Sequence, residues 1–284
     1  ITYKLQSEDK RITLSRNMTF DVHLEQDVNK KQVITVSQLS RFSENITVKR
    51  GSRQDRYTLQ SCEINESTVT DMTPAVDYYS MNLGGKKVYN INRDEGTVTV
   101  ELNGQGVGYE HAWGATETRN TTYVINVTRA MTVANEVYDV DWTGSVEVVQ
   151  SYNKSRQLTY IENEPTQMSF RGGYLETVDE QAVASFNYSM PRFDENGLPK
   201  DRNRSGSLEI KLSSVPTQKR TFIPKLLDTS GHWAQADIEK LVSLGIMAPK
   251  GQYFGPRAYA TRLDFARGLA QLTNIVERAA RFAE

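Results

Sequence analysis

The feature that most constrains the fold is an alternation of apolar and polar residues that runs through roughly the first 220 positions. In one stretch Met18, Phe20, Val22 and Leu24 alternate with polar residues. The same pattern recurs in four later stretches: Val98, Val100 and Leu102; Tyr123, Ile125 and Val127; Val146 and Val148; Leu208, Ile210 and Leu212. Successive side chains of a strand point to opposite faces, so this alternation predicts β-strands with one buried face.

Short turn signals separate these predicted strands. They are Asn82-Leu83-Gly84-Gly85, Asn103-Gly104, Arg171-Gly172-Gly173 and Asn196-Gly197. Strands with one buried face and short connections are typical of antiparallel sheets packed face to face. The sequence therefore predicts a mainly β protein built of β-sandwich modules, followed by a small helical region.

Changes in composition divide the chain into three predicted parts. Residues 1–72 form a first β-rich module, 73–225 a β-sandwich module, and 226–284 a helical region. The polar stretch 194–207 is interpreted as a long hairpin loop, because a strand pattern follows it at once. The chain begins at Ile1, without Met and within a predicted strand, so we expect it to be a trimmed fragment whose first module is incomplete.

The last part of the chain changes to a helical period. Ala234, Ile238, Leu241 and Val242 lie on one stripe, and Gly245 can end this helix. A second helix is predicted to open at Thr261, which forms a Thr-x-x-acid capping pattern with the residue three positions on. We expect helices near 232–245 and 261–280.

Composition excludes several classes of function. There are 34 Lys and Arg residues against 35 Asp and Glu, for a net charge of −1, which argues against binding to nucleic acid through its phosphates. The sequence contains no apolar run long enough to span a bilayer as a helix. The single cysteine, Cys62, rules out an internal disulfide framework and is interpreted as a small half-buried side chain rather than a reactive thiol.

The helical region resembles an S-layer homology motif. The matching residues are Asp228, Gly231-His232-Trp233-Ala234, Ile238-Glu239-Lys240-Leu241, Leu244-Gly245-Ile246, Phe254, Pro256 and Thr261-Arg262-Leu263-Asp264-Phe265-Ala266. A single motif is visible. Its loop reads Ala248-Pro249-Lys250-Gly251-Gln252-Tyr253-Phe254-Gly255-Pro256, where the family usually has Gly-Tyr-x-Asp-Gly-x-Phe-Arg-Pro.

The resemblance implies an exported protein of the bacterial cell surface, held on secondary wall polysaccharides that carry acidic pyruvate ketals. It implies Arg262, Trp233 and Asp264 as glycan-binding residues. An arginine in the first turn opposes the helix dipole, and an anionic ligand at that end would reverse the sign of this effect. The alternatives are a solvated Arg262, or one paired with Asp264, and a Trp233 that packs in the core.

We expect the two helices to bury too little surface to stand alone, so that they either dock on the preceding β module or pack with sister motifs, and we expect the docking. Six residues are predicted to form one small cluster between them: Trp233, Ile238, Leu241, Phe254, Phe265 and Leu269. Arg262 has no place in that cluster and is expected to be at least partly exposed.

Metal and catalytic signals are weak. His23 lies between Asp21 and Glu25, but an exposed histidine between solvated carboxylates is the better interpretation. Asp194-Glu195-Asn196-Gly197 with Asp201 has a composition found in calcium loops without the EF-hand spacing. No serine-hydrolase elbow, zinc-protease motif or phosphate-binding loop is present, and an acidic pair such as Glu162 with Glu164 is common on a β face. We therefore expect no enzyme activity and no cofactor.

The leading hypothesis is a non-catalytic structural protein of the cell envelope, part of a surface layer or surface appendage, with wall polysaccharide as its partner and copies of itself as neighbours. Two alternatives remain. One is a carbohydrate-active enzyme or binding subunit displayed on the wall, whose catalytic module lies outside this chain. The other is a subunit of a surface filament in which exposed sheet edges pair.

Overall fold

A computed structural model describes residues 1–51, 53–73, 75–162 and 172–273 of the chain. The described residues form one antiparallel sheet of eleven strands, followed by two helices. The strands are β1 (Thr2–Gln6), β2 (Ile12–Asp27), β3 (Gln32–Arg50), β4 (Arg53–Met72), β5 (Val76–Ile91), β6 (Gly96–His111), β7 (Gly114–Val133), β8 (Glu136–Ile161), β9 (Gly173–Phe193), β10 (Pro199–Ser213) and β11 (Thr217–Phe222). The helices are α1 (Gln235–Ser243) and α2 (Arg262–Leu272).

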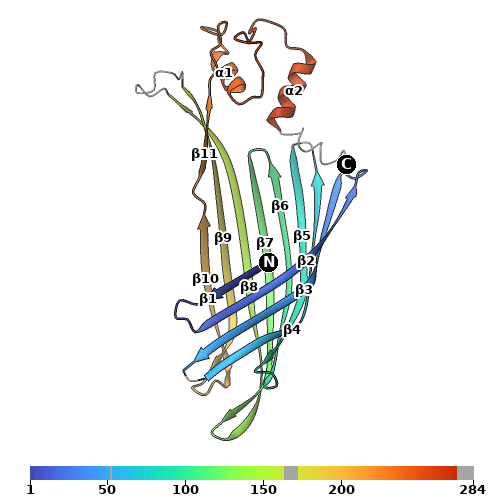
Figure 1. Cartoon of the computed structure of the whole chain (residues 1–284), viewed down its shortest axis with the longest axis vertical. Helices are drawn as coiled ribbons and strands as arrows, with labels where there is room; N and C mark the ends of the chain where they lie inside the picture. Colours follow the sequence, from blue (N-terminus) through green and yellow to red (C-terminus); the bar gives the residue numbers. More distant parts are fainter. Residues whose placement is uncertain (52, 74, 163–171, 274–284) are drawn as a thin grey trace.

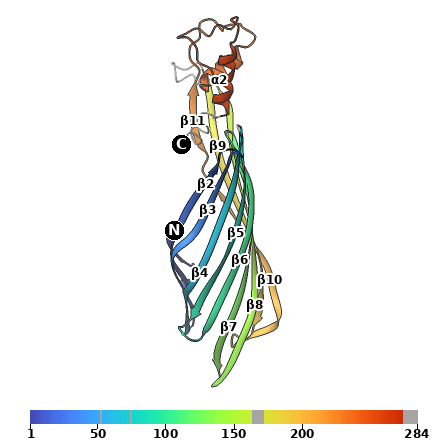
Figure 2. The same ribbon diagram turned by 90° about the vertical axis from the view of Figure 1, so that its right-hand side faces the viewer.

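The sheet is a continuous meander in which each strand from β1 to β10 pairs with the next one along the chain. β10 pairs with the later half of β9, and β11 pairs with its first residues, so that both follow one edge of the sheet. The two views show the sheet curling along its length, with β2 and β3 on one side of a trough and β8 to β10 on the other (Figures 1 and 2). The concave side of this sheet is called the trough below.

The prediction of a mainly β protein with two short helices near the C-terminus is confirmed. The prediction that these strands form β-sandwich modules is wrong, because all eleven described strands belong to one sheet. β4 and β5 pair from Tyr57–Ile91 to Met72–Asp77, so the parts predicted as 1–72 and 73–225 share that sheet. The physical reason is strand length: β2 to β10 have 15 to 26 residues, long enough for twist and coiling to fold one sheet over its own apolar face.

Two of the predicted turns lie inside strands. Asn82 to Gly85 falls within β5 and Asn103-Gly104 within β6, whereas Asn196-Gly197 does lie in the connection between β9 and β10. Glycine within a strand often marks a close approach of neighbouring atoms. A Cβ added to Gly108 would stand 2.5 Å from the ring of Tyr79, so this glycine makes room for a side chain from the next strand.

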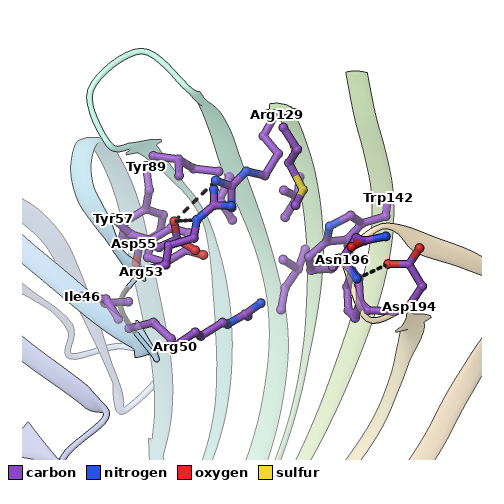
Figure 3. Close-up of a pocket in the computed structure, with 18 of the residues that line it drawn as sticks. Ile46, Arg50, Arg53, Asp55, Tyr57, Tyr89, Arg129, Trp142, Asp194 and Asn196 are labelled. Atoms are coloured by element: carbon purple, nitrogen blue, oxygen red, sulfur yellow. Dashed lines mark hydrogen bonds and ion pairs between the residues drawn. The ribbon is translucent and has the colours of Figure 1, made fainter. Parts of the chain in front are cut away.

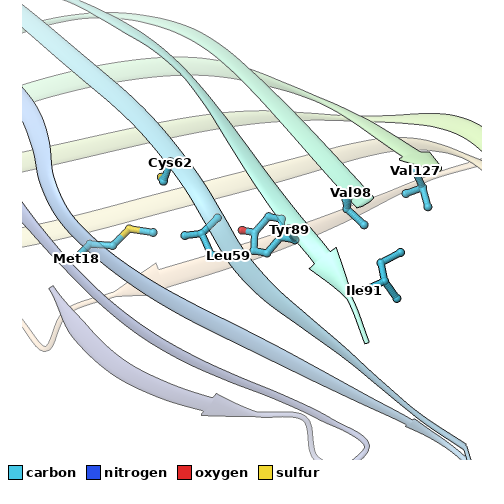
Figure 4. Packing of buried hydrophobic residues seen from close by; sticks show 7 residues of the cluster. All are labelled: Met18, Leu59, Cys62, Tyr89, Ile91, Val98 and Val127. Atoms are coloured by element: carbon cyan, nitrogen blue, oxygen red, sulfur yellow. The ribbon is translucent and has the colours of Figure 1, made fainter. Parts of the chain in front are cut away.

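The apolar core lies on the trough side of the sheet (Figure 4). Its buried residues come from β2 and from β4 to β7: Met18, Leu59, Cys62, Tyr89, Ile91, Val98 and Val127. Cys62 is buried, and this burial raises the pKa of its thiol, in keeping with a structural rather than a reactive side chain. The core is thus assembled by neighbouring strands of one curled sheet.

A buried carboxylate lies beside this core. Glu44 is only 2% exposed, and its oxygens accept hydrogen bonds from Arg16 Nε at 2.5 Å and from the Tyr89 hydroxyl at 2.8 Å. The Lys87 ammonium lies 3.3 Å from the same carboxylate. Three strands, β2, β3 and β5, are therefore linked by one ionic network.

The two helices lie at one end of the trough, and the connection between β9 and β10 lies at the other (Figure 1). Both begin within the predicted ranges; residues after 273, where the second was expected to continue, are outside the described part. The Ser243 hydroxyl of α1 donates to the Thr221 hydroxyl of β11 at 3.1 Å, and the Lys240 ammonium lies 6.0 Å from the centroid of the Tyr174 ring in β9. The expected docking of the helical region on the sheet is thus confirmed for α1.

Candidate functional site

The segment that opens the helical region is fastened to the loop before α2. The Asp228 carboxylate accepts hydrogen bonds from the backbone N–H of Phe254 at 3.0 Å and of Gly255 at 2.7 Å. These bonds, the Phe254 one first, lower the pKa of Asp228 below its ordinary value. The N–H of Leu227 donates to the carbonyl of Gln252 at 2.9 Å. Together they hold two segments side by side that are more than twenty residues apart in the chain.

A groove of about 810 Å³ lies beside this fastening. It is lined by Asp228, Ser230, Gly231, His232, Trp233, Gly255, Pro256, Arg257 and Ala258. The indole of Trp233 is 89% exposed and lies 5.7 Å from the His232 ring, centroid to centroid. His232 is held in place because its Nδ1 accepts a hydrogen bond from the N–H of Ala234 at 3.2 Å. An exposed ring with an arginine nearby suits a ligand that has both an apolar sugar face and an acidic group.

The predicted cluster between the helices is wrong for three of its six members. Ile238 is buried, but Trp233 is 89%, Phe265 66% and Leu269 46% exposed. For Trp233 the reason is local. α1 begins at Gln235, so Trp233 lies in the turn that precedes the helix and does not continue the stripe of Ile238. Its alternative role as a core aromatic is thereby excluded.

The start of α2 has the predicted capping box. The Thr261 side chain accepts a hydrogen bond from the Asp264 N–H at 3.1 Å, and the Asp264 carboxylate accepts one from the Thr261 N–H at 3.3 Å. The Thr261 hydroxyl also donates to this carboxylate at 2.6 Å, which lowers the pKa of Asp264. Asp264 is therefore occupied as a helix cap.

Arg262 is exposed, as expected. It forms no ion pair with any residue that the structure describes, Asp264 included, and it is not among the residues that line the groove. The structure thus places Trp233 in the groove and leaves Arg262 and Asp264 at the start of α2. The glycan-binding roles of these three residues stay predictions.

Two further residues of the groove, His232 and Arg257, were not singled out from the sequence as binding residues. For Arg257 a signal was present: the family pattern has an arginine before the loop proline, and here an arginine follows Pro256 instead. The cation has moved by two positions, and in the folded chain it lies at the groove with Trp233.

The other candidate sites remain apart from this groove. Asp21, His23 and Glu25 are all exposed on β2. The Asp194 carboxylate accepts hydrogen bonds from the N–H groups of Asn196 at 2.9 Å and Leu198 at 2.8 Å, which closes the turn between β9 and β10. In the described ranges no three His, Cys, Asp or Glu residues are grouped so as to hold a metal ion. Glu164 lies outside the described residues.

Residues 226–266 match the family model of the S-layer homology domain. A comparison with curated proteins and one with solved structures found no match to the chain. None of the helices in the described ranges is long and apolar enough to cross a membrane. The chain therefore carries an S-layer homology domain near its C-terminus, preceded by a β-rich region, which indicates a protein anchored at the cell surface or in the cell wall.

Proposed function

We propose that this chain is part of a non-catalytic structural protein of the cell envelope, extracellular and held on the cell wall. Its S-layer homology domain contributes to binding an acidic wall polysaccharide. The observation that carries the proposal is the groove beside Asp228, where an 89% exposed Trp233 and a cationic Arg257 line a domain of a wall-anchoring family. A sugar ring stacks on the indole, and a ketal carboxylate pairs with an arginine.

The test is a pull-down with pyruvylated wall polysaccharide. Trp233→Ala should weaken binding roughly tenfold, the effect of losing one stacking contact of about 1.4 kcal/mol. Tyr259→Ala is the matched control, because Tyr259 is 101% exposed and does not line the groove. The melting temperature should change by no more than about a degree or two, as for a surface substitution.

Substitution of single arginines in the same assay distinguishes the two candidate anion partners. Loss of binding in Arg257→Ala assigns the ligand to the groove, and loss in Arg262→Ala assigns it to the start of α2. Arg267→Ala, exposed on the same helix, is the control. Wild-type protein that does not bind, or Trp233→Ala that binds as the wild type does, would contradict the proposal. New reducing ends released from the polysaccharide by this chain would contradict a non-catalytic role.

Association of copies into a layer or filament is a second candidate role, favoured by the edge strand β10. Within the described residues β10 pairs only with β9, and its apolar residues Leu208, Ile210 and Leu212 are 43 to 67% exposed. An unpaired edge with an apolar row is a template for another strand.

If copies pair through this edge, the wild type should show a concentration-dependent mass in light scattering. Ile210→Lys should shift it to the monomer, because a charge in the apolar row opposes pairing. Ser207→Lys adds the same charge to the same strand at a position of opposite parity and should change the mass less. A wild type that stays monomeric at high concentration would exclude this role for the edge.

A further inference from the structure

A cavity of about 660 Å³ lies in the trough (Figure 3). Its lining includes residues 194–197 of the connection between β9 and β10, which lies at the end of the trough away from the helices (Figure 1). One wall is the concave face of the sheet, with Ile46, Val100, Ile125 and Met131 among its apolar side chains. The connection between β9 and β10 forms the opposite wall. Phe193, the last residue of β9, precedes this connection and meets the ring of Trp142 edge-on, with a centroid distance of 5.5 Å.

This cavity opens to solvent, and its lining divides into an apolar wall and a charged rim. Ordered water needs two to four polar partners, and the apolar walls offer none over most of their area. Its volume falls within the range of roughly 300–1,000 Å³ that ligand pockets occupy. An apolar guest is the occupant that the walls fit.

The rim of the cavity is cationic on the side of β3, β4 and β7. Arg50, Arg53 and Arg129 all line it (Figure 3). Arg129 is 9% exposed, and its guanidinium pairs with Glu95 at 2.8 Å and with Asp55 at 3.5 Å. Its Nε is buried and has no hydrogen-bond partner among the described residues. This atom has no access to the cavity, so Arg129 belongs to the rim through its two ion pairs.

The cavity is lined by three arginines and by three carboxylates, Asp55, Asp194 and Glu195, but none of these carboxylates pairs with Arg50. Asp55 lies 3.4 Å from Arg53 as well, and Asp194 is occupied by the N–H groups of its own turn. Arg50 forms no ion pair with any residue in the described part of the chain, and its side chain reaches over the strands toward the side of Asn196 (Figure 3). A charge of the opposite sign on the ligand would therefore meet Arg50.

From this geometry we infer that the trough binds an amphiphile with one long apolar chain and an acidic head group, carboxylate or phosphate. The chain fills the cavity between the sheet and Phe193. The head group lies at the rim, where it pairs with Arg50. This site is separate from the wall-anchoring groove, which lies with the helices at the other end of the sheet.

The experiment titrates the whole chain with cis-parinaric acid, whose fluorescence rises in an apolar site, and displaces it with three ligands of equal chain length. Palmitate or hexadecyl phosphate should displace the probe at least roughly tenfold better than hexadecanol, because only they carry the charge that meets Arg50. The acid that displaces the probe at the lower concentration identifies the head group as carboxylate or phosphate. Hexadecanol that displaces as well as both acids, or the absence of any probe binding, would overturn the inference.

Variants then locate the site. Arg50→Gln should weaken acid binding roughly tenfold, while Lys49→Gln, exposed and next to it on the strand, should leave it unchanged. Val100→Trp fills the cavity and should abolish binding, with Thr99→Trp as its control of opposite parity. Should Val100→Trp fail to fold, Arg50→Gln still decides. Full acid binding in Arg50→Gln, or in a folded Val100→Trp, would show that the amphiphile does not occupy this cavity.

Discussion

Replacing Glu44 by alanine is expected to lower the free energy of unfolding by about 3–5 kcal/mol, because it leaves Arg16 and Lys87 as buried cations without a counter-charge. The side chains of these two cations are only 24% and 11% exposed, so water can replace the lost carboxylate only in part. The Tyr89 hydroxyl loses its acceptor as well. Urea unfolding of the variant and the wild type measures the difference.

Glu101→Ala is the matched control. Glu101 forms an ion pair with Lys86 at 3.5 Å, but both side chains are more than half exposed. An exposed pair contributes less than about 1 kcal/mol. Equal losses in the two variants would mean that the Glu44 network does not stabilise the sheet beyond an ordinary surface pair.

The same network predicts a loss of stability in acid. Burial raises the pKa of Glu44, but the Arg16 hydrogen bond, the Lys87 charge and the Tyr89 hydroxyl outweigh it and hold the pKa below the ordinary value of 4.5. A carboxyl whose folded-state pKa is depressed stabilises the fold above its unfolded pKa, and this contribution is lost as the pH falls through the folded value. The Arg16 guanidinium lies 2.5 Å from the Glu44 carboxylate and the Lys87 ammonium 3.3 Å, so Arg16 is the closer counter-charge. Below about pH 4.5 the stability of Glu44→Gln should fall less steeply than that of the wild type.

The local elements of this protein could be predicted from its sequence, because each depends on neighbours in the chain. Alternation over residues 18–24 needs only the geometry of a strand, and it lies within β2. The capping pattern of Thr261 and Asp264 is likewise complete within four residues, and the box is present in the structure.

The arrangement of the strands could not be predicted in the same way, because pairing joins residues far apart in the chain. The alternation is the same in two facing sheets and in one curled sheet. Strand length decides between the two arrangements, and the sequence pattern underestimates it because glycines inside a strand are interpreted as a turn. Asn82 to Gly85 reads as a turn when taken alone. In the structure the same glycines lie inside β5, which continues through them and has 16 residues. Likewise the exposure of Trp233 depends on where α1 begins, a boundary that sequence patterns place poorly.

This account of the glycines predicts opposite results for two adjacent positions. A Cβ on Gly85 would stand 2.5 Å from the carbonyl oxygen of Glu63 and 3.1 Å from the Cα of Ile64, both in the backbone of β4. Since neither atom can move without shifting that strand, Gly85→Val should lower the free energy of unfolding by about 1–3 kcal/mol or more. A Cβ on Gly84 would meet nothing within 4 Å.

Gly84→Val should therefore stabilise the protein by up to about 1 kcal/mol, because valine suits an extended backbone better than glycine does and restricts the unfolded chain. Urea unfolding of the two variants is the measurement, and the sign of the difference is decisive. In a tight turn, as the sequence suggests, both substitutions would destabilise, since both positions would need the conformational freedom of glycine. In a strand whose trough side closely contacts its neighbour, only the residue on that side must be glycine. Gly84→Val should then be more stable than the wild type, and Gly85→Val less stable.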